Sequence, residues 1–162
     1  MGISNRLKQI ADLVTPGNRA ADIGTDHGYV PAYLIKEHIC PKVLAMDMSR
    51  GSLDKAVELS QRLGISDVME CRLSDGFEKL APGEVDTVII SGMGGILMTN
   101  IMSAHSQVLG SLKELILSPH RDADLVRSFI TENGFSIVED KVIIDKKKQY
   151  VVLKAVKNTV YL

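Results

Sequence analysis

Three aspartates, Asp22, Asp47 and Asp75, each follow a short apolar run in the first half of the chain. Asp47 comes 25 residues after Asp22, close to the spacing at which an acidic side chain accepts both hydroxyls of a bound ribose. At the end of the next apolar run, Asp75 can accept a hydrogen bond from the exocyclic amine of an adenine. Asp22 can accept from its own loop or from a ligand amino group. The three residues together predict a site for a ligand that contains a nucleoside.

A glycine-containing loop, DIGTDHG at residues 22–28, begins with the first of these aspartates. Gly24 and Gly28 allow the backbone to approach a ligand closely, because no Cβ stands in the way. Such a loop on its own is also compatible with a tight strand-to-helix turn. Asp26 would repel a pyrophosphate, whose usual site consists of backbone donors at a helix N-terminus. S-adenosylmethionine (SAM) has no phosphate and carries a cationic sulfonium, so the loop favours SAM over a dinucleotide.

We therefore expect SAM to be held by residues that follow the apolar runs. The expected cofactor-binding residues are Asp22, Gly24, Thr25, Gly28, Asp47, Met48, Ser74, Asp75, Gly76 and Ser91.

A second glycine-rich segment, SGMGG at residues 91–95, has three glycines in five residues. A substrate can approach such a backbone closely beside the expected methyl donor, although a flexible lead-in to a helix is an alternative. Enzymes that methylate exocyclic amino groups often carry an Asn/Asp-Pro-Pro-aromatic motif at this place, and this segment does not contain it. A ring nitrogen, an oxygen or a carbon is therefore the favoured acceptor.

Apolar runs alternate with helical patterns along most of the chain, which predicts strands that alternate with helices. The predicted strands cover residues 20–23, 43–46, 68–73, 85–90 and 114–117. The predicted helices are a leader helix over 4–15 and helices over 32–36, 50–63 and 123–133. Ser4 and Ser49 are expected to cap the first and third of them. In the last, Leu125, Val126, Phe129 and Ile130 are expected to point inward.

The pattern changes after Gly134, where residues 135–144 and 150–156 face each other across the polar segment 145–149. This arrangement predicts an antiparallel hairpin. The preceding alternation predicts a mostly parallel sheet covered by helices on both faces. SAM-dependent methyltransferases end their sheet with a reversed strand, whereas nicotinamide-binding Rossmann domains usually continue with parallel strands. The predicted fold is therefore α/β and Rossmann-like, with a mostly parallel seven-stranded sheet that ends in an antiparallel hairpin.

A length of 162 residues and a hydrophobic content of 45% predict one domain over residues 1–162. No apolar run approaches the roughly 18 to 20 residues of a membrane span, and we expect a cytoplasmic protein without a membrane partner. The net charge of -1 provides no global attraction to nucleic acid. The spacing of His and Asp residues does not favour a metal site. The sequence leaves the oligomeric state open, and a monomer is compatible with it.

With these residues assembled, the chain resembles the bacterial tRNA adenine-N1 methyltransferases that modify adenine 22 in the D-arm region. The resemblance spans nearly the whole chain. It depends on ISNRL at 3–7, DIGTDHGYVP at 22–31, SGMGG at 91–95, DLVR at 124–127 and NGF at 133–135. It implies a domain that transfers a methyl group from SAM to N1 of an adenine in tRNA and releases S-adenosylhomocysteine.

Two features differ from this family. Relatives often have Gln-Pro-Asn after the fifth strand, where this chain has Ser118, Pro119 and His120, so an imidazole replaces an amide. The family typically continues into a C-terminal helical, coiled-coil-like region, and this chain stops at Leu162. Weaker tRNA binding is expected without that region.

Methylation of adenine N1 requires its lone pair to line up behind the sulfonium methyl group, so positioning is expected to supply much of the rate enhancement. The base must be unpaired or extruded to free its Watson–Crick edge. We hypothesise that Asp26 stabilises the positive charge on the base or accepts a proton from it. His27 would orient Asp26 or share the proton, and Tyr29 would stack on the base. Loop hydrogen bonding for Asp26 and His27, and packing for Tyr29, are the alternatives.

The substrate is expected to contact the second glycine-rich segment and nearby cationic residues. The expected substrate-binding residues are Gly92, Met93, Gly94, Gly95, Pro119, His120, Arg121 and Arg6. Arg6, Lys8, Arg50, His120 and Arg121 could contact tRNA phosphates, with solvated surface as the alternative.

Two other functions stay open. A SAM-dependent methyltransferase that acts on a small molecule, rRNA or a protein would share every SAM-related feature. A non-catalytic SAM- or nucleotide-binding module would keep the aspartates but would not need the segment 91–95.

Overall fold

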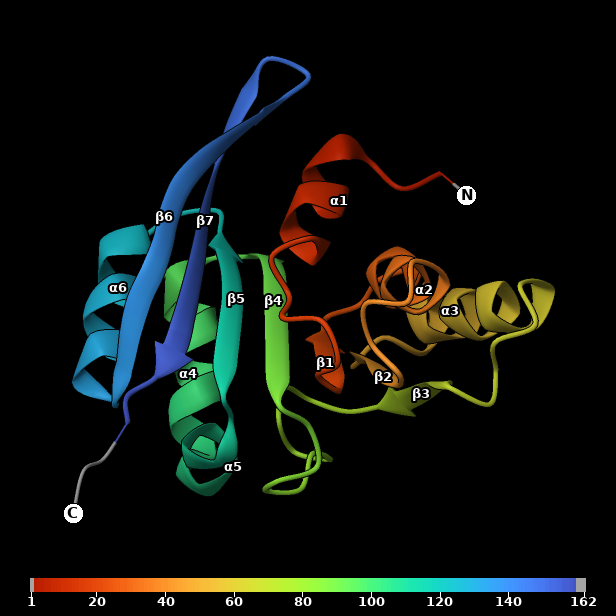
Figure 1. The fold of residues 1–162 in the computed structure, drawn as a ribbon, viewed down its shortest axis with the longest axis horizontal. Helices are drawn as coiled ribbons and strands as arrows, with labels where there is room; N and C mark the ends of the chain where they lie inside the picture. The colour runs from red at the N-terminus through yellow and green to blue at the C-terminus, as the bar shows by residue number, and fades with distance from the viewer. Residues whose placement is uncertain (1, 160–162) are drawn as a thin grey trace.

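The computed structural model describes residues 2–159, which form a seven-stranded sheet with helices around it (Figure 1). The strands are β1 (Ala20–Ile23), β2 (Val43–Asp47), β3 (Met69–Leu73), β4 (Thr87–Met93), β5 (Glu114–Pro119), β6 (Phe135–Asp145) and β7 (Lys148–Lys157). Their order across the sheet is β3-β2-β1-β4-β5-β7-β6. Neighbours among β1 to β5 are parallel, and β7 is antiparallel to both β5 and β6. The predicted Rossmann-like fold with a terminal antiparallel hairpin is confirmed.

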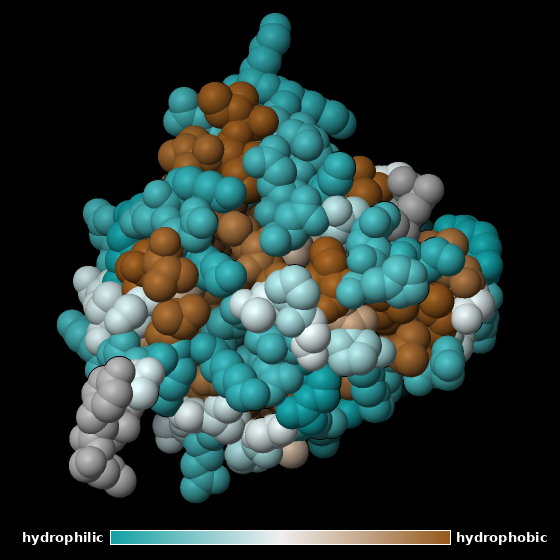
Figure 2. Space-filling view, in the orientation of Figure 1, coloured by the Kyte–Doolittle hydropathy of each residue, from teal (hydrophilic) through white to brown (hydrophobic). Residues whose placement is uncertain are grey.

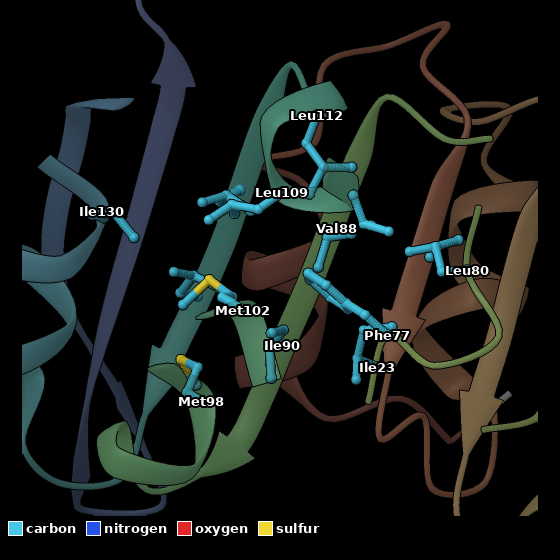
Figure 3. Close-up of a cluster of buried hydrophobic side chains, with 14 of the residues drawn as sticks. Ile23, Phe77, Leu80, Val88, Ile90, Met98, Met102, Leu109, Leu112 and Ile130 are labelled. Carbon is cyan, nitrogen blue, oxygen red and sulfur yellow. The ribbon is translucent and has the colours of Figure 1, made fainter. Parts of the chain in front are cut away.

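Helices cover both faces of the sheet, as predicted. The helices are α1 (Asn5–Ala11), α2 (Tyr29–Lys36), α3 (Arg50–Arg62), α4 (Gly95–Ala104), α5 (Ser106–Ser111) and α6 (Ala123–Glu132). Successive strand residues point to opposite faces, so Ile89 packs with α1 and α2 whereas Ile90 packs with α4 and α6. Figure 3 shows part of the second layer, where Met98 and Met102 of α4 lie near Ile90. Burial on two faces explains why the parallel strands are continuous apolar runs.

The leader helix is shorter than predicted. The Ser4 hydroxyl caps it, but the helix ends at Ala11 and not at residue 15. Its end is a tighter turn, because the N–H groups of Leu13 and Val14 donate to carbonyls three residues earlier instead of four. The apolar spacing therefore continues past the point where the α-helical hydrogen bonds stop.

The helical layer of α4 to α6 contains two departures from the sequence pattern. No helix was predicted between residues 96 and 113, because α4 is apolar on much of its circumference and shows no single apolar face. Leu125 of α6 was expected to point inward, but 46% of its surface is exposed, whereas Val126 and Ile130 are fully buried. α6 therefore presents only a narrow apolar stripe to the sheet.

The C-terminal hairpin extends beyond the rest of the sheet, and its tip is hydrophilic (Figures 1 and 2). The turn consists of Lys146 and Lys147, whose φ angles are 51° and 66°. Two-residue turns with positive φ match the twist of paired strands. The predicted loop over 145–149 is too long, because Asp145 already pairs with Lys148.

Candidate active site

The strand order reverses between β1 and β4, which are adjacent parallel strands. Ligands of open α/β sheets bind at such a switch point, outside the carboxyl ends of the strands. A cavity of about 220 Å³ lies here between α1, the loop after β1, the start of α2 and the end of β4. Its lining residues are Arg6, Leu7, Asp22, Gly24, Thr25, Asp26, His27, Tyr29, Val30, Ser91 and Gly92. The cavity therefore brings together residues predicted for cofactor binding, catalysis and substrate binding.

The loop 22–28 adopts left-handed backbone at both of its glycines. The φ angles are +74° at Gly24 and +82° at Gly28, a region that is costly for residues with a Cβ. A Cβ on Gly28 would also lie 2.7 Å from Met69 Cε and 2.9 Å from Ala56 Cβ. Gly28 is therefore required by packing against β3 and α3, a reason that the sequence pattern did not reveal.

Asp47, at the end of β2, ties this loop to the start of α3. Its Oδ2 accepts a hydrogen bond from the Asp26 N–H at 2.9 Å, and its Oδ1 accepts from the Ser49 N–H at 2.8 Å. The first of these contacts supports Asp26 in its left-handed conformation, with φ of 58°. Because a carboxylate can accept several hydrogen bonds, Asp47 can also accept from ligand hydroxyls.

Asp22 is buried, with 3% of its surface exposed. Burial raises the pKa of its carboxyl to about 7; the Thr25 side chain opposes the rise, and the charges of Asp47 and Asp26 add to it. A cationic ligand group would stabilise the ionised form of this carboxyl. Asp22 is thus suited to bind a positive charge inside the cavity.

Two other polar atoms of the cavity residues are buried and make no hydrogen bond of ordinary geometry within residues 2–159. They are Thr25 Oγ1 and Arg6 Nη1. Buried polar atoms without partners are costly in a folded protein. Their position in one cavity is consistent with a polar ligand.

The three predicted catalytic residues lie together at the cavity. Asp26 Oδ1 is 3.5 Å from His27 Nε2, and the His27 and Tyr29 rings meet edge to face with centroids 6.1 Å apart. Asp26 Oδ1 also accepts from the Ser52 hydroxyl at 3.5 Å, a contact that the sequence did not indicate. The Asp26 side chain is 74% exposed and therefore accessible to a substrate. The catalytic roles themselves stay predictions.

The segment 91–95 is partly strand, which corrects the prediction that β4 ends at residue 90. β4 continues to Met93, which pairs with Pro119 of β5, and the register shifts around Gly92, whose φ is +81°. A glycine at a bulge weakens the strand signal in a sequence while it permits the irregular backbone.

His120 and Arg121 lie beside this segment. A Cβ on Gly92 would be 3.8 Å from His120 Nε2, and a Cβ on Gly94 would be 3.5 Å from Arg121 Cγ. The Gly95 N–H donates to the Arg121 carbonyl at 2.9 Å. The structure therefore joins most of the predicted substrate-binding residues into one surface, and their contact with a substrate stays a prediction.

The ends of β2 and β3 lie outside the lining of this cavity. The Ser74 hydroxyl is used within its own turn, where it donates to the Gly76 carbonyl at 3.0 Å, so it is less available to a cofactor than the sequence suggested. Asp75 and Met48 are exposed, with 71% of the Met48 surface accessible. These two side chains remain candidates for contact with an adenine.

A second cavity, of about 180 Å³, lies beside His27 and Tyr29. The sequence pattern did not lead us to predict it. Its other lining residues come from one face of α3: Lys55, Glu58, Leu59 and Arg62. Their spacing of three, four and seven residues was a signal that could have revealed this shared face.

A model of the methyltransferase-domain family matches residues 3–153 of this chain. The chain belongs to this family. The tRNA (adenine(22)-N(1))-methyltransferase of Bacillus subtilis is 30% identical over 153 residues, which are 94% of this chain and 64% of that relative. The domain described here thus spans slightly less than two thirds of the length of this curated relative.

Solved structures share the fold of this methyltransferase domain. A Streptococcus pneumoniae protein in complex with S-adenosyl-L-methionine is 28% identical, with a TM-score of 0.92 over 99% of this chain and 75% of that one. Mycoplasma capricolum TrmK in complex with S-adenosyl-homocysteine is 25% identical, with a TM-score of 0.88 over 98% of this chain and 70% of that one.

None of the helices described between residues 2 and 159 is long and apolar enough to span a membrane. Within the same part of the chain, no three His, Cys, Asp or Glu side chains are grouped in a way that could hold a metal ion.

Proposed function

We propose that this methyltransferase domain transfers a methyl group from SAM to N1 of an adenine in the D-arm region of tRNA. The observation that carries the proposal is the cavity between β1 and β4, which joins the acidic loop 22–28 to the glycine-rich end of β4. The name of the Bacillus subtilis relative supports the choice of acceptor, and the ligands of the two solved relatives support the choice of cofactor. Such a substrate implies a cytoplasmic location.

The residues around the cavity fit SAM. Asp22 would accept from the cofactor's amino group, and Asp47 would accept from the ribose hydroxyls. Asp75 and Met48, both exposed, would contact the adenine. A pyrophosphate would meet the carboxylates of Asp22 and Asp26 instead of a site lined with backbone donors. When bound, SAM supplies an electrophilic methyl group on its sulfonium.

The contribution of the protein's own residues is chiefly to hold the acceptor base in line with the methyl group. The absence of side chains at Gly92 and Gly94 leaves room for a base at the end of β4. Asp26 would stabilise the positive charge that spreads over the methylated ring or accept a proton from the exocyclic amine. His27, 3.5 Å away, would orient Asp26, and Tyr29 would offer a ring for stacking.

Incubation of the protein with methyl-labelled SAM and unmodified bacterial tRNA tests this proposal. After digestion of the RNA, we expect N1-methyladenine from the D-arm, and no label in a matched tRNA whose adenine at that position is replaced by guanine. Label in rRNA, in a protein or in a small molecule would favour a methyltransferase with another substrate. Normal SAM binding by calorimetry with no transfer to any of these acceptors would favour a non-catalytic binding module.

A further inference from the structure

The tip of the C-terminal hairpin carries three consecutive lysines, Lys146, Lys147 and Lys148. All three residues are exposed. Among residues 2–159, none of the three forms an ion pair with a carboxylate. Figure 2 shows hydrophilic surface at the far end of the projecting hairpin. The tip is therefore a compact cationic patch on a protein whose overall charge is -1.

The backbone of this turn does not by itself favour lysine. The φ angles of Lys146 and Lys147 are 51° and 66°. This left-handed region is unfavourable for a long side chain, and two-residue turns of this kind prefer Asn-Gly at the two positions. The twist of the paired strands therefore explains the positive φ angles but not the choice of lysine. A function of the charge would explain that choice.

The direction of the strands places this patch at the edge of the sheet that holds the active site. β7 is antiparallel to β5 and to β6, so β6 runs in the same direction as β1 to β5. The carboxyl end of β6, which the lysines follow, therefore lies at the same edge as the carboxyl ends of β1 and β4. Figure 1 shows the hairpin extending beyond this edge beside α1. A large substrate that enters the cavity at this edge would meet the tip.

Contacts with α1 fix the orientation of the tip. Asp145 Oδ2 accepts a hydrogen bond from the Arg6 N–H at 3.4 Å, so the acidic side chain next to the lysines is turned toward α1. Arg6 Cζ lies 4.6 Å from the centroid of the Tyr150 ring on β7. Because Arg6 also lines the cavity, one residue of α1 joins the hairpin to the active site.

We propose that the lysines of the hairpin tip bind the phosphodiester backbone of tRNA beside the adenine that is methylated. The inference rests on the proposed function, because it assumes that tRNA is the substrate. Lysine ammonium groups neutralise phosphates without reading the base sequence. The tip would therefore add affinity and hold the RNA in register, while the residues at the cavity act on the base.

A double substitution separates the charge of the tip from its fold. Lys146→Asn together with Lys147→Gly provides the residues that this turn prefers, so the melting temperature is expected to equal or exceed that of the wild type. The same variant loses two phosphate contacts. We expect tRNA binding to weaken about 5- to 50-fold at about 0.1 M salt. The slope of log affinity against log salt should fall by about 1.4–1.8, which corresponds to two contacts. Filter-binding titrations of the full chain at several salt concentrations measure both quantities.

A control variant removes the same number of charges at the opposite edge of the sheet. Lys36 ends α2 and Lys42 precedes β2, and both are exposed. Lys36→Asn together with Lys42→Asn is expected to leave the slope equal to that of the wild type. In steady-state methyl transfer, the tip variant is expected to raise the KM for tRNA more than it lowers kcat, because the tip does not touch the reacting atoms.

The remaining outcomes separate this inference from the proposed function. If the tip variant keeps the affinity and salt slope of the wild type, the lysines do not bind the RNA, and the proposed function stands. If its melting temperature and affinity fall together while the slope stays constant, the fold of the hairpin matters and its charge does not, so this inference is wrong. If the wild-type chain neither binds nor methylates tRNA, the proposed function fails and this inference fails with it.

Discussion

Two aspartates of the loop after β1 differ sharply in their exposure to water. Asp22 is 3% exposed, whereas the side chain of Asp26, four residues later, is 74% exposed. A buried carboxyl pays a desolvation cost when it ionises, and an exposed one does not. Asp22 is therefore suited to a cationic group held inside the cavity, and Asp26 is suited to a substrate that arrives from solvent.

The raised pKa of Asp22 predicts how the stability of the ligand-free protein changes with pH. The pKa of this carboxyl is about 7 in the folded protein, whereas its ordinary value is 3.8. Because the native state holds the proton more tightly, Asp22 contributes stability below its unfolded pKa, and this contribution is lost as pH rises through the native pKa. Over this range the wild type should lose on the order of 4 kcal/mol that Asp22→Asn does not lose. Denaturant unfolding of both proteins at several pH values checks this, and parallel pH curves would contradict it.

At Asp26 we expect a loss of turnover without a loss of cofactor binding. Asp26→Ala removes the carboxylate that would face the base and is expected to lower the methyl-transfer rate on the order of 100-fold. Asp26→Asn keeps a side chain that tolerates the observed φ of 58° and separates the effect of charge from that of backbone strain. Single-turnover kinetics at saturating SAM, with calorimetry for SAM affinity, measure both quantities. Turnover near that of the wild type in Asp26→Ala would show that the carboxylate has no catalytic role.

At the scale of elements, the end of β4 and the start of α4 pack closely against the loop after β5. Gly95 begins α4 and donates its N–H to the Arg121 carbonyl, and Met93 accepts from the His120 N–H at 2.8 Å. These backbone contacts place the glycine-rich segment beside the imidazole and guanidinium of the next loop. The two loops therefore form one continuous surface, which we propose as the substrate surface, only if their backbones can approach this closely.

Adjacent glycines in this segment provide a matched pair of substitutions. A Cβ on Gly95 would lie 2.5 Å from the Asp122 carbonyl oxygen and 2.8 Å from that of Arg121, so the backbone would have to shift. Gly95→Ala is expected to destabilise the fold by about 1–3 kcal/mol and to lower methyl transfer. At Gly94 the nearest atoms are side-chain atoms of Arg121 at 3.5 Å or more, so Gly94→Ala should cost less than about 1 kcal/mol. Chemical denaturation of the two variants tests this, and equal costs would refute the steric explanation.

At the scale of the whole molecule, the net charge provides no global attraction to a nucleic acid. The net charge is -1, and Figure 2 shows hydrophilic surface interrupted by hydrophobic patches. Some of the exposed hydrophobic residues lie on the projecting hairpin, where Val142 and Ile144 are 55% and 65% exposed. Binding of RNA would therefore depend on a few local cations near the carboxyl ends of the strands.

The salt dependence of tRNA binding tests this view of the molecule. Each cation that neutralises a phosphate contributes about 0.7–0.9 to the slope of log affinity against log salt. We expect Arg50→Ala and Arg121→Ala each to reduce the slope by about this amount. Lys36→Ala is the control, because Lys36 is exposed at the end of α2 away from the cavity. Filter-binding titrations at several salt concentrations provide the slopes, and identical slopes for all four proteins would remove Arg50 and Arg121 from the interface.

The sequence by itself determined the type and order of most elements and the composition of the acidic loop and of segment 91–95. These features are local, since hydrophobic period, serine caps and glycine punctuation act over a few residues. For the same reason the pattern failed where local signals are weak. It assigned no helix to residues 96–113, and it ended β4 before its glycine bulge at Gly92.

Only the tertiary structure decided which distant residues share the cavity. Arg6 reaches the loop of Asp22 because α1 packs on the face of the sheet that also holds α2, and Tyr150 reaches Arg6 because β7 returns antiparallel to β5. Tertiary packing also buries Asp22, and it leaves no room for a Cβ at position 28 beside Met69 and Ala56. Strand order and crossover packing set these contacts, and the hydrophobic period of a single segment does not encode them.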